Sequence, residues 1–280
     1  MTLLPNRPLF LLCLYLIVAQ SARANAWTQP SGGSQVIFNL TYFQSYHQYD
    51  SFGRVIPNPN GAYFRQFLLN PYFEFGLSDR TTLVVNAYIP FLAYHDTFTQ
   101  QESAGWGDTE IGIRRRITSL KSRLAFSAQG TVLFPAYSPD REPPPGNHNI
   151  DVEARVLFGH GTQFSSEKRN FFWDLEAAYR HRDGPPADEV RIDATVGIEP
   201  FRRILLLEQF FVIKSLQNGS PFTPQTNPNA QSDFDLYKLQ SSFVVALNRK
   251  TRVQVGWVDV VSGRNTGRGS SLLLSVWRNF

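Results

Sequence analysis

The sequence of 280 residues contains a single cysteine, Cys13, which lies in an apolar N-terminal stretch. An intramolecular disulfide is therefore excluded, and a chain of this size must be stabilised in another way. A lipid anchor on Cys13 is also excluded, because the preceding position, where a small residue is required, holds Leu12. A closed β-barrel meets the need for stability, since every strand is hydrogen-bonded to a neighbour.

Long apolar runs are missing after the N-terminal stretch, and the mean hydropathy is −0.25. A helical membrane protein is thereby excluded, because a spanning helix needs about 20 apolar residues. Amphipathic strands are compatible with such an average, because their two faces cancel. Neither sign of charge is in large excess. The formal net charge of +4 falls to about +2 if Arg7 and Arg23 leave with a leader. No nucleic-acid partner is expected from so small a net charge.

The N-terminal segment has the layout of a secretory signal peptide. Arg7 precedes the apolar run from Leu9 to Ala19, and the small-residue site Ala24-Asn25-Ala26 follows. The run is shorter than the roughly 20 residues of a spanning helix, which favours cleavage over anchoring. We therefore expect a cleaved leader over residues 1–26 and an exported domain over residues 27–280.

Alternation with a period of two dominates the remaining chain. Between residues 81 and 94, Leu83, Val85 and Ala87 fall on one face, while Thr82 and Asn86 fall on the other. The pattern predicts about twelve strands, at residues 34–48, 61–77, 81–94, 107–118, 123–136, 149–159, 170–182, 189–200, 204–216, 235–247, 251–261 and 270–280. The strands of a soluble β-sandwich also alternate between apolar and polar residues. The strands predicted here are longer than the usual length of about 5 or 6 residues, which suits a tilted membrane crossing. The predicted fold class is all-β: one closed antiparallel transmembrane β-barrel.

The predicted connections alternate in length. Residues 78–80, 119–122, 201–203 and 248–250 are short turns, whereas residues 49–60, 95–106, 137–148 and 217–234 are longer loops rich in Pro, Gly and Asn. Outer-membrane barrels have short periplasmic turns and long extracellular loops. One turn, at residues 160–169 with Glu167 and Lys168, is longer than this pattern. The terminal Phe280 resembles the signal that the barrel assembly machinery reads, although Arg278 stands where an apolar residue is usual.

The polar strand faces carry charges of both signs. Such a set can pair across neighbouring strands, which indicates a salt-bridged lumen wall without strong selection for anions or cations. The candidates for the lumen lining are Glu74, Asp108, Glu110, Arg114, Arg116, Asp151, Glu153, Arg155, Asp174, Glu176, Arg180, Arg191, Asp193, Glu208, Lys238 and Arg252.

Candidates for catalysis are few. Ser45 and His47 share a predicted strand face, and outer-membrane lipid-modifying enzymes use a Ser and a His two residues apart. Here the order is reversed, and the strand pattern turns Ser45 toward the lumen rather than the lipid. The five histidines are scattered without metal-ligand spacing. We expect no catalytic residue, metal or cofactor.

Two segments carry a family resemblance. Gly105 to Arg116, with a Gly-x-Gly-Asp loop leading into a strand that ends in basic residues, and Asn70 to Arg80, with a Gly-Leu-Ser-Asp turn, resemble the outer-membrane family named after the meta-pathway of phenol degradation. That family is grouped by resemblance with channels for long-chain fatty acids and aromatic hydrocarbons. The resemblance implies uptake of hydrophobic compounds. Those channels have a sizeable N-terminal plug, whereas only Trp27 to Gly33 precede the first predicted strand.

The predicted function is passive uptake of small hydrophobic or aromatic molecules through a Gram-negative outer membrane. Twelve strands fall between the filled barrel of about eight strands and the open porin of about sixteen, so a narrow or gated passage is expected. The expected partners are outer-membrane lipids and lipopolysaccharide, the barrel assembly machinery and a small-molecule solute. Two alternatives stay open: a non-transporting structural or adhesion barrel, and a lipid-modifying enzyme.

Overall fold

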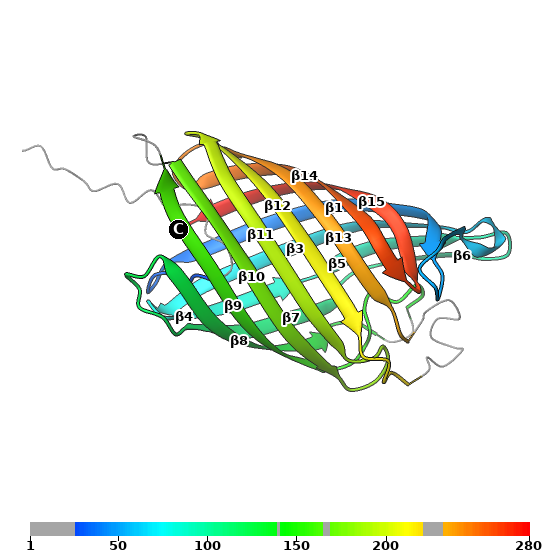
Figure 1. The fold of residues 1–280 in the computed structure, drawn as a ribbon. Coiled ribbons are helices and arrows are strands. Elements are labelled where there is room, and N and C mark those ends of the chain that lie inside the picture. The colour runs from blue at the N-terminus through cyan, green and yellow to red at the C-terminus, as the bar shows by residue number, and fades with distance from the viewer. Residues whose placement is uncertain (1–25, 139–140, 165–168, 221–231) are drawn as a thin grey trace, which may run out of the picture.

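The computed structural model describes residues 26–138, 141–164, 169–220 and 232–280. These residues form a closed antiparallel barrel of twelve strands (Figure 1), which confirms the predicted all-β class. Two of the twelve are broken in the middle, so that β4 continues as β5 and β6 continues as β7. The elements are β1 (Ser34–Tyr49), β2 (Val55–Pro57), η1 (Pro59–Gly61), β3 (Tyr63–Ser78), β4 (Thr81–Ala87), β5 (Ile89–His95), β6 (Gln100–Ala104), β7 (Asp108–Arg116), β8 (Leu124–Pro135), β9 (Asp151–Phe164), β10 (Arg169–Arg182), β11 (Glu189–Phe201), β12 (Ile204–Ser215), β13 (Asp235–Ala246), β14 (Thr251–Arg264) and β15 (Thr266–Asn279).

The barrel closes between its first and last strands. β1 pairs with β15 from Gln35 opposite Asn279 to Tyr49 opposite Thr266, and the backbone N–H of Phe280 donates to the Ser34 carbonyl at 2.9 Å. On its other side β1 pairs with β3. The twelve strands therefore leave no open edge, and their backbone polar groups are satisfied without water.

The two ends of the barrel differ. The connections β3–β4, β11–β12 and β13–β14 are short and lie at what we term the turn end, where β1 begins and β15 finishes (Figure 1). The longer connections β1–β3, β8–β9 and β12–β13 lie at the opposite, loop end. β9 and β10 extend further than predicted, to Phe164 and from Arg169, so the turn expected at residues 160–169 is shorter; its Glu167 and Lys168 lie outside the described residues.

The last hairpin also departs from the predicted boundaries. The expected loop between residues 261 and 270 is absent, because β14 runs to Arg264 and β15 starts at Thr266. The chain reverses at Asn265, whose φ of 52° lies in the left-handed region that asparagine tolerates better than most residues. No helix in the described part of the chain is both long and apolar enough to span a membrane.

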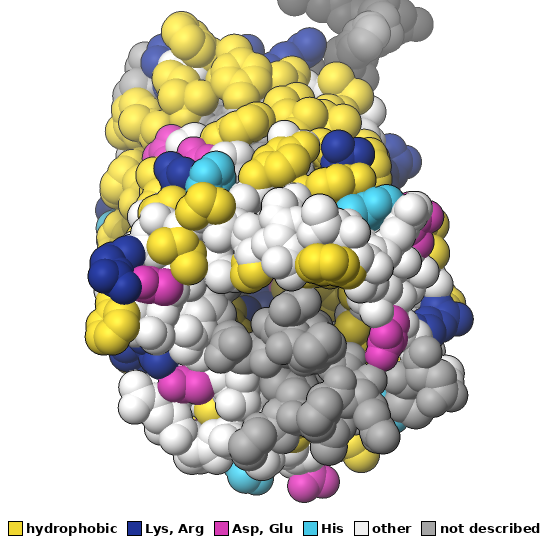
Figure 2. Space-filling model, turned by 90° about the vertical axis from the view of Figure 1, so that its right-hand side faces the viewer, with side chains coloured by type: hydrophobic (Ala, Val, Ile, Leu, Met, Phe, Trp, Pro, Cys, Tyr) yellow, Lys and Arg dark blue, Asp and Glu magenta, His cyan; other side chains and the backbone are white. Residues whose placement is uncertain are grey.

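The outward strand faces are apolar. Phe38, Leu40 and Phe67 are exposed on β1 and β3, and the rings of Tyr42 and Phe67 lie 4.6 Å apart between the same strands. The same character continues on the other strands through Val156, Leu175, Val196, Leu272 and Val276. Seen from the loop end, hydrophobic side chains gather on an outer flank (Figure 2). An apolar outer band of this kind is the lipid-facing surface of a transmembrane barrel.

Candidate functional site

The barrel interior has two contrasting walls. The inward side chains of β7 and β9–β11 are mostly charged, and we term them the charged wall. The inward side chains of β12–β15, β1 and β3 are mostly amides, aromatics and aliphatics, and we term them the neutral wall. The difference arises from the alternate residues of each strand, since period-two alternation sends one set inward and the other to the lipid.

The charged wall is a continuous network of ion pairs. Arg155 bonds Glu153 at 2.8 Å, Glu176 at 2.5 Å and Asp193, and so joins β9, β10 and β11. Arg180 reaches Glu110 of β7 at 3.0 Å and Glu153 at 2.7 Å. Glu153, Glu176 and Arg180 are buried and the other three are half-buried, so their charges are compensated mainly by one another rather than by water.

The same network extends toward the loop end. Arg182 bonds Glu189 at 2.7 Å and lies 3.5 Å from Asp151. Arg191 is held more loosely, at 3.5 Å from Glu153 and 3.9 Å from Glu189. Mutual pairing across four strands fills the lumen on this side with side chains.

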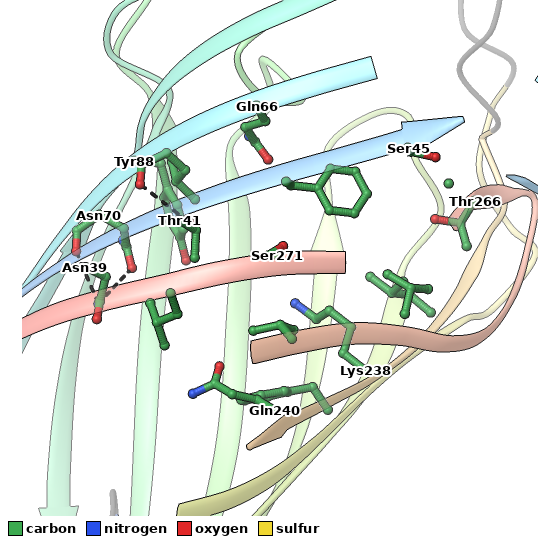
Figure 3. Close-up of a pocket in the computed structure, with 18 of the residues that line it drawn as sticks. Asn39, Thr41, Ser45, Gln66, Asn70, Tyr88, Lys238, Gln240, Thr266 and Ser271 are labelled. Atoms are coloured by element: carbon green, nitrogen blue, oxygen red, sulfur yellow. Dashed lines mark hydrogen bonds between the residues drawn. The ribbon is translucent and has the colours of Figure 1, made fainter. Parts of the chain in front are cut away.

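The neutral wall borders a cavity of about 1170 Å³ that reaches the loop end. Amide and hydroxyl groups project into it from Asn39, Thr41, Gln66, Asn70, Gln240 and Ser271 (Figure 3). The aromatic and aliphatic lining is formed by Phe43, Phe64, Leu68, Tyr72, Tyr88, Leu207, Phe211, Leu236, Val258, Val260, Leu273 and Trp277. The cavity is larger than the usual upper range for a small-molecule pocket, about 1,000 Å³, and combines apolar walls with a few polar groups as such pockets do.

The first part of a short N-terminal segment, Ala26 to Gln29, lies inside the barrel near the turn end, whereas Pro30 to Gly32 are exposed. The carbonyl of Ala26 accepts a hydrogen bond from Ser127, and the carbonyl of Trp27 accepts one from Arg114 at 3.2 Å. Gln29 donates to Glu74 at 2.7 Å. Only Trp27 to Gly33 precede the first strand, yet the start of this segment occupies the lumen, because its carbonyls and the Gln29 side chain find hydrogen-bond partners on the inner wall.

Arg114 and Glu74 anchor this segment. They form an ion pair of 2.7 Å between β7 and β3, and Tyr72 donates to Glu74 at 2.5 Å. Both charged side chains are buried. The two charges thus neutralise each other, and the pair supplies fixed hydrogen-bond partners for Trp27 and Gln29.

Trp27 narrows the turn end of the lumen. Its ring packs against Phe172, Leu205, Leu207 and Val244. Gly159 makes room for it, since a Cβ there would lie 2.6 Å from the indole. Trp27 and Phe172 line both the main cavity and a smaller one of about 350 Å³ toward the turn end. These two rings therefore lie between the two cavities, and we term them the constriction.

Loop residues shape the opposite mouth. Ser103 donates to the Pro143 carbonyl at 2.5 Å and Gln101 donates to Glu142 at 2.6 Å, which holds the β8–β9 connection over the rim. Asp96 also lines the cavity there. The backbone N–H of Phe98 lowers the pKa of Asp96, and the N–H of Thr99 adds to the effect. The mouth thus carries carboxylates that already have hydrogen-bond donors.

The structure places most of the predicted lumen candidates on the inward faces. Arg116 and Arg252 lie at the turn end, where Arg116 donates to the Ser119 and Ser122 carbonyls and Arg252 lies 3.5 Å from Glu199. Asp108 lies at the loop end of β7 and accepts from Asn147 N–H at 3.1 Å. The inward candidates of the charged wall and its rim are Asp108, Glu110, Arg114, Arg116, Asp151, Glu153, Arg155, Asp174, Glu176, Arg180, Arg191 and Asp193; Glu74, Lys238 and Arg252 belong to the neutral side.

Glu208 does not face the lumen as predicted. It is exposed on the outer face of β12 and accepts a hydrogen bond from Ser241, whereas Leu205, Leu207 and Gln209 face inward. The predicted lumen position of Glu208 is wrong by one residue. The segment Ile204 to Leu207 is apolar on both faces, so it offers no alternation to fix the register.

Ser45 and His47 do not share a face. A β-bulge between them shifts the register against β15, which leaves Ser45 buried beside the cavity and His47 exposed. The Ser45 hydroxyl lies 2.6 Å from the His47 carbonyl and 2.8 Å from the Arg268 carbonyl. The prediction of a shared face is wrong because a bulge adds one residue to a strand and inverts the alternation. Within the described ranges, no group of three or more His, Cys, Asp and Glu is placed to hold a metal ion.

Comparison with known proteins identifies the fold. No family model and no curated protein matches the sequence. The chain is similar to the COG4313 outer membrane channel from Pseudomonas putida F1, with a TM-score of 0.67 and 13% identity over 92% of this chain and 99% of that chain. A weaker likeness is to the NanC porin, with a TM-score of 0.47 and 8% identity over 86% of this chain and 98% of that chain. Another is to a mutant of the TodX monoaromatic hydrocarbon channel, with a TM-score of 0.45 and 8% identity over 90% of this chain and 91% of that chain. The protein therefore has the fold of a bacterial outer-membrane channel.

Proposed function

We propose that the protein is a passive channel of the Gram-negative outer membrane for small hydrophobic or aromatic molecules. The observation that carries this proposal is the cavity of about 1170 Å³ along the neutral wall. It lies inside a closed barrel, reaches the loop end and is bordered by aromatic, aliphatic and amide side chains. Flat rings such as Tyr72, Tyr88 and Phe211 give an apolar solute contact area, while the amides keep the space hydrated.

The proposed orientation follows from the connections. The loop end faces the cell exterior and the turn end faces the periplasm, as in other outer-membrane barrels. The apolar outer band contacts outer-membrane lipids and lipopolysaccharide. Phe280, directly after β15, carries the signal for the barrel assembly machinery, and residues 27–280 form the exported protein after the leader is removed.

Movement through the channel is driven by the solute gradient in this proposal. A solute from outside first meets the neutral wall and then the constriction of Trp27 and Phe172. The resemblance of the segment Gly105 to Arg116 to a family linked with phenol degradation supports the substrate class. The charged wall supports selectivity only indirectly, because its ion pairs narrow the lumen and leave the neutral side as the path.

The proposal is tested with liposomes that contain the purified barrel. Uptake of phenol and of toluene-like solutes is compared with uptake of a sugar of similar size, and protein-free liposomes supply the background. We expect the protein to accelerate the aromatic solutes more than the sugar. Equal rates with and without protein would contradict transport and leave a structural or adhesion barrel. Acceleration of the sugar alone would indicate a general hydrophilic porin.

A further inference from the structure

Lys238 stands apart from the other interior cations. It lies on the inward face of β13 and points into the cavity (Figure 3). In the part of the chain that the structure describes, its ammonium group forms no ion pair with a carboxylate. Its observed contact is with the Phe211 ring, whose centroid lies 5.4 Å from Nζ.

The interior arginines have anionic or carbonyl partners. Arg114, Arg155 and Arg180 bond carboxylates at 2.5–3.0 Å, and Arg116 donates to two main-chain carbonyls. A partly buried cation without an anion is costly in a narrow lumen, and such groups inside membrane proteins commonly mark ligand or ion pathways. An anion from solution that binds Lys238 would supply the missing partner.

The surroundings of Lys238 favour an anion with an apolar body. Phe211 on β12 and Val260 on β14 are its direct cross-strand neighbours. Both line the cavity, as do Leu236 and Val258 on the same side. Gln240, two residues along the same face, already donates to Gln209 and Ser242, so Lys238 is the donor left for the ligand on this part of β13. An inorganic anion would use the charge but leave these apolar contacts unused.

The rest of the cavity restricts where an acidic group can bind. The other charged side chains that border it, Glu74, Asp96, Glu142 and Asp174, are all acidic. Glu74 is compensated by Arg114, but Asp96, Glu142 and Asp174 would repel a second carboxylate on the ligand, since like charges at close range disfavour binding. A ligand with one acidic group is therefore preferred, and Lys238 is the place for that group.

We propose that Lys238 binds the carboxylate of an aromatic or short aliphatic monocarboxylate, with the apolar body packed against Phe211 and Val260. This inference rests on the proposed channel function and narrows its substrate class from hydrophobic molecules in general to amphipathic organic acids. A charge-assisted hydrogen bond from the ammonium group fixes the acid, and the ring or chain lies along the neutral wall.

Binding is measured first, without transport. The detergent-solubilised full-length protein is titrated calorimetrically at neutral pH with benzoate and with benzamide, its uncharged counterpart. We expect K238M to raise the dissociation constant for benzoate about tenfold, as loss of one hydrogen bond to a charged group implies, and K238R to restore most of the affinity. Benzamide binding should change little. K250M, which removes the same charge from the exposed β13–β14 turn, is the matched control.

Flux in proteoliposomes then separates this inference from the proposed function. We expect the half-saturating concentration for benzoate to rise in K238M, with benzamide flux unchanged. If K238M binds and transports benzoate like the wild type, the Lys238 inference is wrong, whatever the flux of neutral solutes. If benzoate binding depends on Lys238 but no aromatic solute crosses faster than in protein-free liposomes, the site stands and the channel function fails.

Discussion

The charged wall and the neutral wall are built from the same kind of amphipathic strand but do different things. Arg155 and Arg180 of the charged wall each bond carboxylates from more than one strand. Gln240 and Gln209 of the neutral wall bond each other at 2.7 Å and still border the cavity. The residue type on the inward face therefore decides whether the side chains of a strand fill the lumen or line a path through it.

The physical cause is the cost of an unpaired charge. Carboxylates and guanidinium groups in a narrow lumen must find partners, so they reach across strands and close the space between them. Amides and rings tolerate a neighbouring solute or water without a comparable penalty. The barrel thus gains rigidity on one side and keeps an open volume on the other.

The largest expected effect is on stability, from Arg155→Met in the charged wall. It leaves Glu153, Glu176 and Asp193 without their shared partner, and removal of one member of a buried ion pair costs about 3–5 kcal/mol. The free energy of unfolding is measured by urea titration in lipid vesicles, followed by tryptophan fluorescence.

Two matched substitutions sharpen this test. Gln209→Met in the neutral wall should cost about 1 kcal/mol or less, because its hydrogen bonds are between neutral groups. Arg202→Met removes an exposed arginine at the turn end and should be near neutral. Equal losses in the free energy of unfolding for Arg155→Met and Gln209→Met would contradict the distinction between the two walls.

A smaller effect is expected on conductance, from Trp27→Ala. Loss of the indole widens the constriction beside Phe172, and single-channel conductance in planar bilayers should rise roughly twofold or more, because the narrowest section dominates the resistance of a pore. Stability should change less than with Arg155→Met, since the strands themselves are intact.

Gly76→Ala gives the same prediction by another route. A Cβ at Gly76 would lie 1.9 Å from the Pro30 carbonyl, so the N-terminal segment must move away from β3. Gly130→Ala is the control, because nothing lies within 4 Å of a Cβ there. If Trp27→Ala and Gly76→Ala both conduct like the wild type, the N-terminal segment does not limit the passage.

Sequence alternation predicted the twelve strands closely but the two walls less well. Period two places Glu153, Arg155 and Glu176 on one face without ambiguity, since apolar residues flank each of them. It fails at Glu208, where Ile204 to Leu207 are apolar on both faces, and at His47, where a bulge after Ser45 inverts the pattern. Both failures are local losses of the alternation itself.

The segregation of charge and the lumen position of Trp27 could not be predicted for a different reason. They depend on which strands face each other across the closed barrel and on where a short extended segment finds backbone partners. Arg180 and Glu110 are 70 residues apart in the sequence. A strand pattern compares only residues that lie close together in the sequence, so it cannot predict this pair. The one available sign was compositional: the strands from residue 204 onward carry few charges at inward positions.

The most direct test of the neutral wall as the path uses cysteines at two adjacent positions. Gln240 lines the cavity and Ser241 is exposed on the outer face, and Cys13, the chain's only native cysteine, lies in the expected leader. A bulky thiol reagent is applied to Gln240→Cys and to Ser241→Cys in planar bilayers, with labelling confirmed by mass. We expect labelled Gln240→Cys to lose most of its conductance and its aromatic flux, and labelled Ser241→Cys to keep both. Full conductance in labelled Gln240→Cys would contradict the account, because solutes would then cross the barrel elsewhere.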